Sequence, residues 1–144
     1  MEKVLFYEGR WYFFSNFSAF MVRWRDSDWT TAEHAYQAAK FDDPDIIEKV
    51  RSARSAHDAK KVARAHDKTR IANWDDVKVE IMEEIVRAKL EQHPYIRRKL
   101  LETGEAEIVE DSPSDSFWGR GCDWKGKNHL GKIWMKLRDE LKLQ

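Results

Sequence analysis

The longest periodic stretch of the chain limits its fold most, because it predicts one helix of about five turns. Between Asp75 and Gln92 apolar side chains recur at helical spacing and share one face. These side chains are Val77, Ile81, Ile85 and Ala88. Charged residues such as Glu84 and Lys89 occupy the remaining positions and are expected to face water. A helix of this length needs other elements to cover its apolar face, so we expect it at the centre of the fold.

Further helices are predicted from the residues that start and end them. Asp43 followed by Pro44 has the pattern of an N-cap and a first helical residue. Ser55 with Asp58 predicts the start of another helix, which runs to about Ala65. These signals are local, so they locate helix starts without any knowledge of the tertiary structure.

The remaining elements complete a mainly helical α+β class. Pro94 predicts a helix that Gly104 ends, because glycine tolerates the left-handed conformation beyond a helix terminus. Short strands are expected within 4–29 and at 107–110, where aromatic and β-branched residues gather between turn residues. Apolar spacing predicts a C-terminal helix with Leu130, Trp134, Leu137 and Leu141 on one face. With 144 residues, we expect one compact domain over residues 1–144, with a small N-terminal β element and a helical core.

Composition excludes several functional classes. Lys plus Arg and Asp plus Glu both number 26, so no net charge attracts the whole molecule to nucleic acid, and any such contact would be local. No apolar run reaches the roughly 18 residues of a spanning helix, so we expect no membrane partner and a cytoplasmic location. Cys122 is the only cysteine. The five histidines lack ligand spacing and are expected at the surface or at caps, so we predict no metal and no cofactor. They are His34, His57, His66, His93 and His129.

The segment TTAEHAYQAAKF, residues 30–41, contains the first candidate for chemistry. In one continuous helix Glu33 and Lys40, seven residues apart, would point within about 20° of the same direction. A structural alternative for Glu33 is a capping box, in which Thr30 caps the helix and Glu33 reaches back to a backbone amide. For Lys40 the alternative is a solvated lysine near a helix C-terminus.

Two aromatic segments contain polar side chains that could contact a ligand. FFSNF, residues 13–17, places Ser15 and Asn16 among phenylalanines, and a hydroxyl and an amide can bind a ribose or a phosphate. ANWDD, residues 72–76, could present Trp74 as a stacking surface before the long helix. The structural alternatives are a capped turn for the first segment and a hydrophobic staple for the second.

The glycine-rich segment 112–131 is the third candidate. Its glycines permit close approach of a backbone to a ligand, while Asp115, Trp118 and Arg120 supply a carboxylate, a ring and a cation. The spacing is not that of a phosphate-binding loop, so an ordinary glycine-rich connector remains an equal alternative.

Taken together and in order, five blocks resemble the NADAR family, most closely its YbiA-like branch. The blocks are FFSNF, TAEHAYQAAKF, NWDDVKVEIM, VEDSPSDSFWGRG and GKNHLGKIWMKLR, and they span nearly the whole chain. The resemblance implies a mainly helical α+β domain that hydrolyses N-glycosidic bonds. It implies a small-molecule substrate, either a phosphoribosylaminopyrimidine of riboflavin synthesis or, as an alternative, ADP-ribose on guanine of modified nucleic acid.

The resemblance also assigns residues by position. Glu33 matches the acidic residue of the family's helix and Lys40 the lysine that closes that block, while Trp74, Asp115 and Trp118 match its other polar and aromatic pocket positions. We expect Glu33, Lys40 and Asp115 to be catalytic. Ser15 with Asn16 matches the family's early Ser-Asn pair. The residues that we expect to bind substrate are Ser15, Asn16, Trp74, Trp118, Gly119 and Asn128. One departure concerns the phosphate: where relatives often carry a glycine and an arginine after the third helix, this chain has Ala65-His66-Asp67.

Both substrate types attach ribose C1′ to an exocyclic amine, and this chemistry leaves two routes open. Lys40 could attack C1′ to form a Schiff base while Glu33 transfers the proton, which requires the lysine to lose its proton. Alternatively, Glu33 or Asp115 activates water while the other acid protonates the leaving amine. A rival of another class is a module that binds ADP-ribose or a nucleotide without cleaving it.

Overall fold

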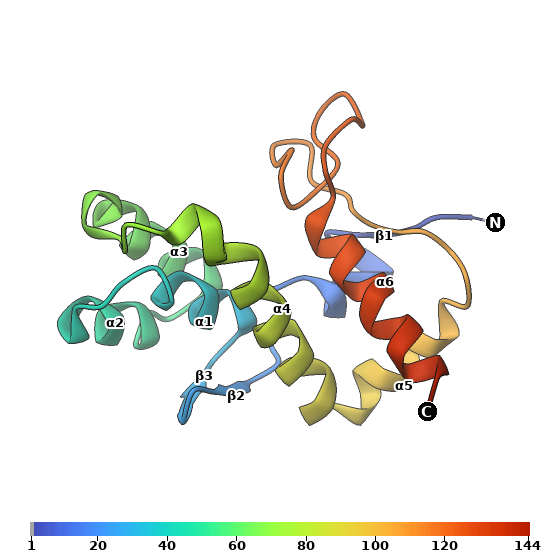
Figure 1. The fold of residues 1–144 in the computed structure, drawn as a ribbon, viewed down its shortest axis with the longest axis horizontal. Helices are drawn as coiled ribbons and strands as arrows, with labels where there is room; N and C mark the ends of the chain where they lie inside the picture. The colour runs from blue at the N-terminus through green and yellow to red at the C-terminus, as the bar shows by residue number, and fades with distance from the viewer. Residues whose placement is uncertain (1) are drawn as a thin grey trace. The chain divides into compact units, whose positions relative to one another are not determined.

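The computed structural model describes residues 2–144, whose elements gather into two compact units. The terminal unit contains residues 2–15 and 93–144, and the central unit contains residues 16–92. Each unit has a two-stranded sheet and helices of its own. The long predicted helix belongs to the central unit (Figure 1).

The central unit begins with an antiparallel hairpin of β2 (Val22–Trp24) and β3 (Ser27–Trp29). Arg25 and Asp26 form its turn with φ angles of 51° and 62°. Two consecutive left-handed residues are what a two-residue hairpin turn requires, because its twist then matches that of the strands. Strand β3 begins directly after this turn, at Ser27.

Three short helices of the central unit pack pairwise on one another (Figure 1). They are α1 (Ala32–Ala38), α2 (Pro44–Arg51) and α3 (Ala56–Ala65), with the 3-10 helix η2 (Asp67–Thr69) following. Two predicted starts are confirmed: the Asp43 side chain caps α2, and Ser55 Oγ accepts a hydrogen bond from the Asp58 N–H of α3. The small residues Ala59 and Ala63 are buried in α3, which permits close packing.

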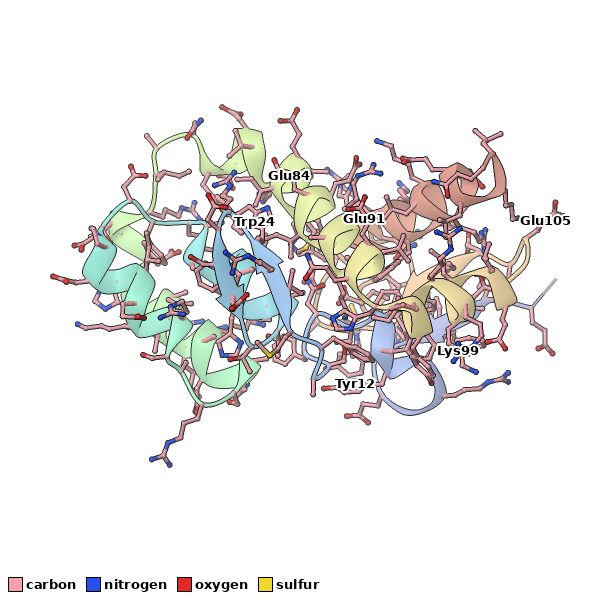
Figure 2. All side chains as sticks on the ribbon, turned by 90° about the horizontal axis from the view of Figure 1, so that it is seen from below. Tyr12, Trp24, Glu84, Glu91, Lys99 and Glu105 are labelled. Atoms are coloured by element: carbon pink, nitrogen blue, oxygen red, sulfur yellow. The ribbon has the colours of Figure 1, made fainter. Side chains whose placement is uncertain are left out.

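The long helix α4 (Trp74–Gln92) confirms the strongest sequence prediction. It packs on β2 and α1 and buries Ile81 and Ile85. Glu84 Oε1 accepts a hydrogen bond of 3.2 Å from Trp24 Nε1, a pair labelled in Figure 2. The prediction that Lys89 faces water is wrong, because its side chain is fully buried and its ammonium donates to Ser18 Oγ at 2.9 Å. Burial lowers the pKa of Lys89 to about 7.

In the terminal unit β1 (Val4–Phe6) pairs in parallel with β4 (Ile108–Glu110). The 3-10 helix η1 (Gly9–Phe14) contacts β1, and α6 (His129–Lys142) packs on β4. Both strands lie within the predicted segments. Their pairing joins residues about one hundred positions apart and has no local signal in sequence.

Aromatic packing fills the core of the terminal unit. Trp134 of α6 is fully buried, packs at a tilt against the Phe14 ring, and donates from Nε1 to the Phe14 carbonyl at 3.1 Å. Helix α5 (Pro94–Glu102) packs on α6 and ends before Gly104, whose φ of 62° confirms the predicted stop. The α+β, mainly helical class is therefore confirmed, and the single domain over residues 1–144 stays a prediction.

Candidate active site

The start of α1 determines how Glu33 is presented. Thr31, not Thr30, is the N-cap, and its hydroxyl accepts a hydrogen bond from the His34 N–H at 3.2 Å. Glu33 is consequently the second helical residue and not the third, so the capping-box alternative is wrong. Its backbone N–H instead donates to the Asn16 carbonyl at 3.0 Å.

The Glu33 carboxylate is buried among amide side chains, with 6% of the residue exposed. Gln37, one turn further along α1, donates from Nε2 to Glu33 Oε2 at 2.7 Å. The other amide atom, Gln37 Oε1, is buried and accepts no hydrogen bond from the described residues. The same holds for Asn16 Oδ1, whose amide nitrogen contacts the sulfur of Met82. A carboxylate and two amide oxygens thus make this part of the central unit rich in acceptors.

Lys40 lies beyond the end of α1 and not on its predicted continuation to Phe41. Its N–H bonds the Gln37 carbonyl at 3.3 Å and the Phe41 N–H bonds the Ala38 carbonyl, both i to i−3 bonds that tighten the last turn. The prediction of one continuous helix through both residues is therefore wrong. The Glu33 carboxylate nevertheless acts electrostatically on the Lys40 ammonium.

The charge state of Lys40 reflects opposing influences. Burial lowers the pKa of Lys40 from its ordinary value, and the Glu33 and Asp67 carboxylates partly oppose this by raising it. Arg70 and Lys60 act in the same direction as burial. A half-buried amine beside a carboxylate and other cations is easier to deprotonate than a lysine in water. Sequence patterns did not single out Arg70 or Lys60 as neighbours of Lys40.

Trp74 lies in the same unit but is only 2% exposed. Its ring packs against Tyr36 with centroids 5.3 Å apart, and the Lys40 ammonium lies 5.6 Å from the Tyr36 ring centroid. The buried position agrees with a packing role as described by the staple alternative. A stacking role for Trp74 stays a prediction.

The other predicted site residues belong to the terminal unit, where loop 111–128 uses several of them internally. Asp115 Oδ1 accepts hydrogen bonds from the backbone N–H groups of Phe117 at 3.0 Å and Trp118 at 2.8 Å. This arrangement is an Asx-type turn that orders the backbone under the Trp118 ring. The Trp118 ring contacts Phe117 and His129, with centroids 4.8 Å and 6.2 Å away.

Gly119 and Asn128 hold the same loop against β4. A Cβ on Gly119 would lie 2.9 Å from the Glu110 carbonyl oxygen, so the position accepts only glycine without a backbone shift. Asn128 has a left-handed φ of 53°, and both ends of its amide bond β4: Oδ1 accepts from the Glu110 N–H and Nδ2 donates to the Ile108 carbonyl, each at 2.9 Å. Both residues therefore build the loop, and their predicted contact with substrate is untested.

Two more predictions concern Ser15 and the histidines. Ser15 is buried after η1, and its N–H bonds the Tyr12 carbonyl at 2.9 Å, in keeping with the capped-turn alternative. His34 is fully buried, which contradicts a surface position. Its ring nitrogens contact Thr31 Oγ1 at 2.8 Å and the Ala53 carbonyl at 2.9 Å, so it links the start of α1 to the turn after α2.

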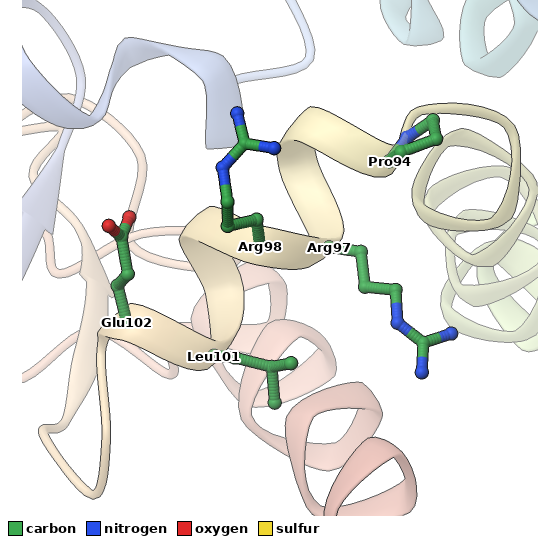
Figure 3. A pocket seen from close by; sticks show the side chains of 5 residues that line it. All are labelled: Pro94, Arg97, Arg98, Leu101 and Glu102. Atoms are coloured by element: carbon green, nitrogen blue, oxygen red, sulfur yellow. The ribbon is translucent and has the colours of Figure 1, made fainter.

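The predicted site residues belong neither to a metal-binding cluster among the described residues nor to the two surface depressions described below. Among residues 2–144 no three His, Cys, Asp or Glu side chains are placed to hold a metal ion, and no helix is long and apolar enough to cross a membrane. A depression of about 460 Å³ lies on α5, but the Arg97 and Arg98 side chains beside it extend in different directions (Figure 3). A second, of about 490 Å³, lies in the central unit beside Trp24 and contains none of the predicted site residues.

Comparison with known proteins gives consistent matches along the chain. The model of the NADAR domain matches residues 5–142. N-glycosidase YbiA of Escherichia coli is 40% identical over 131 residues, which cover 91% of this chain and 82% of the relative. An N-glycosidase of Nostoc punctiforme is 42% identical over 132 residues, covering 90% and 85%.

A longer relative and a solved structure extend the comparison. A riboflavin biosynthesis protein of Vibrio vulnificus is 40% identical over 129 residues, which cover 90% of this chain but only 35% of that protein. The NMR structure of the Escherichia coli protein YbiA matches with a TM-score of 0.87 and 37% identity, covering 99% of this chain and 88% of that one.

Proposed function

The chain belongs to the NADAR family, and from this membership we propose that it is an N-glycosidase that hydrolyses the C1′–N bond of a ribosylated amine. The favoured substrates are the phosphoribosylaminopyrimidine intermediates of riboflavin synthesis. Two kinds of relative support this choice: proteins named N-glycosidase that match over most of their length, and longer proteins named for riboflavin biosynthesis that contain a similar segment.

The observation that carries the proposal is a desolvated Lys40 on which the Glu33 carboxylate acts electrostatically. Burial lowers the pKa of Lys40, which increases the fraction of neutral amine available as a nucleophile at neutral pH. The Glu33 carboxylate acts on the same ammonium and is the nearby group able to receive its proton. A structural lysine on a solvated helix end would have neither feature.

The chemistry then follows in two stages. Lys40 transfers a proton to Glu33, and its neutral Nζ attacks C1′ of the substrate to form a new C–N bond. The bond from C1′ to the pyrimidine amine breaks, and Glu33 returns the proton to that leaving amine. The ribose ring then opens: the C1′–O4′ bond breaks, O4′ takes a proton from Lys40 Nζ, and a protonated Schiff base forms between C1′ and Nζ. Water adds at C1′ and the C1′–Nζ bond breaks, which releases ribose 5-phosphate as its aldehyde and the lysine amine. Glu33 thus enters the reaction ionised.

A product assay tests the function directly. Purified protein is incubated with a phosphoribosylaminopyrimidine, with EDTA present to remove free metal, and products are resolved by chromatography. We expect ribose 5-phosphate and the free pyrimidine in equal amounts. Glu33→Gln keeps an oxygen able to accept from Gln37 Nε2, so we expect unchanged Tm and turnover reduced by about 10²-fold or more. Equal turnover of the two proteins would remove Glu33 from the mechanism.

The same assay separates the alternatives. An oligonucleotide carrying ADP-ribose on guanine is supplied in a parallel reaction, and preferential release of ADP-ribose there would reverse the order of the two substrates. Binding of either compound by calorimetry without any product would instead identify a recognition module.

A further inference from the structure

We infer that Gln37 is a positioning residue for the Glu33 carboxylate, an inference that rests on the proposed function. Its Nε2 donates to Glu33 Oε2 at 2.7 Å from one turn along the same helix, so the amide holds one carboxylate oxygen. Because Oε2 is held by this bond, the orientation of the whole carboxylate, and with it of Oε1, is defined. Helix α1 fixes the spacing of the two residues without help from a loop.

The burial of Gln37 shows that this position does not serve stability alone. Only 3% of the residue is exposed, and its Oε1 accepts no hydrogen bond from the described residues. A buried acceptor without a partner destabilises the folded state, so an apolar side chain of similar length would suit the packing better. What an apolar side chain cannot supply is the Nε2 donor. The Gln37 amide therefore combines an oxygen, Oε1, whose burial destabilises the fold with a nitrogen, Nε2, that donates to Glu33.

The donor also favours the ionised carboxylate, because a hydrogen bond to a charged acceptor stabilises the charged form. In the proposed mechanism Glu33 must be ionised to receive the Lys40 proton. Gln37 consequently acts twice on one group: it orients the carboxylate and keeps it in the form that accepts a proton. Loss of the donor should weaken both effects.

The experiment compares wild type, Gln37→Met and Gln37→Glu in the product assay across pH. Met keeps the length and removes the donor, and we expect kcat lowered on the order of 10-fold to 100-fold with KM changed much less. The acid limb of the pH profile should move to higher pH, because protonation of Glu33 is opposed less. Tm of Gln37→Met should equal or exceed that of wild type. Gln37→Glu, which replaces the donor by a like charge, should move the acid limb further.

Gln92→Met is the matched control in the same unit. The Gln92 amide makes two hydrogen bonds of 2.7 Å to the Arg23 backbone, so this variant should lower Tm and leave kcat and the pH profile unchanged. An unmoved pH profile in both Gln37 variants, whether their Tm falls or not, would overturn the inference. If wild type itself releases no product from either substrate, the proposed function fails first, and the two failures are distinguishable.

Discussion

Helix α1 and loop 111–128 both carry predicted site residues, but they use polar side chains in opposite ways. In the loop the polar atoms are satisfied by the loop's own backbone or by β4: Asp115 caps two amides, and Asn128 bonds β4 with both amide ends. Around α1, Gln37 Oε1 and Asn16 Oδ1 are buried and accept no hydrogen bond from residues 2–144, and the Lys40 ammonium is desolvated.

This difference distinguishes the predicted site residues that stabilise the fold from those that we expect to take part in the reaction. A polar group that is fully bonded inside the fold stabilises a shape, whereas a buried group left unsatisfied costs free energy and suggests another purpose. We therefore expect the reaction to take place at α1 and the turn that follows it, and the loop to order rings and backbone. Substitutions in the two regions test this expected division of roles.

The largest effect is expected at Lys40. If its amine forms the Schiff base, Lys40→Arg should be as inactive as Lys40→Met, with turnover lowered on the order of 10³-fold or more, because both remove the nucleophile. Borohydride added during turnover should leave a reduced sugar on Lys40 of wild type, detected by mass spectrometry of the peptide. An active Lys40→Arg without any adduct would show that only positive charge is needed, and would favour water attack.

The next effect contrasts two tryptophans in different surroundings. Trp74 is 2% exposed against Tyr36, so Trp74→Ala should lower the free energy of unfolding by about 3–5 kcal/mol. Trp118 is half-buried, and Trp118→Ala should cost less stability while weakening substrate binding by roughly 1–3 kcal/mol, the scale of one stacked ring. Urea denaturation and KM measured on both variants check this. A stable Trp74→Ala with raised KM would restore the stacking role predicted from sequence.

Local signals explain how much of the molecule was predictable. The caps at Asp43 and Ser55 and the stop at Gly104 depend on neighbouring residues, and all three are confirmed. The cap of α1 was misplaced by one residue because Thr30 and Thr31 are chemically equivalent in sequence. The N-cap is Thr31, whose hydroxyl also contacts the buried His34 ring.

Non-local features were out of reach for sequence reasoning. The parallel pairing of β1 with β4 joins residues about one hundred positions apart. The burial of Lys89 depends on Ser18, which lies 71 residues away. Motif resemblance selected Glu33 and Lys40 without giving their geometry. Gln37 was missed, although its spacing of four residues from Glu33 was a readable signal for a helical side-chain pair.

The smallest and most discriminating effect concerns Asp115, for which the motif and the structure suggest different roles. If Asp115 is part of the scaffold, Asp115→Asn keeps the Oδ1 acceptor for Phe117 and Trp118 and should retain stability and activity. Asp115→Ala removes that acceptor and should cost about 0.5–2 kcal/mol, as loss of a side-chain cap does. If Asp115 is instead an acid or base, both variants should lose about 10²-fold in kcat, because neither carries a titrating carboxyl. Measuring kcat and Tm for the pair therefore decides the role, and an inactive but stable Asp115→Asn would place chemistry in the loop as well as beside α1.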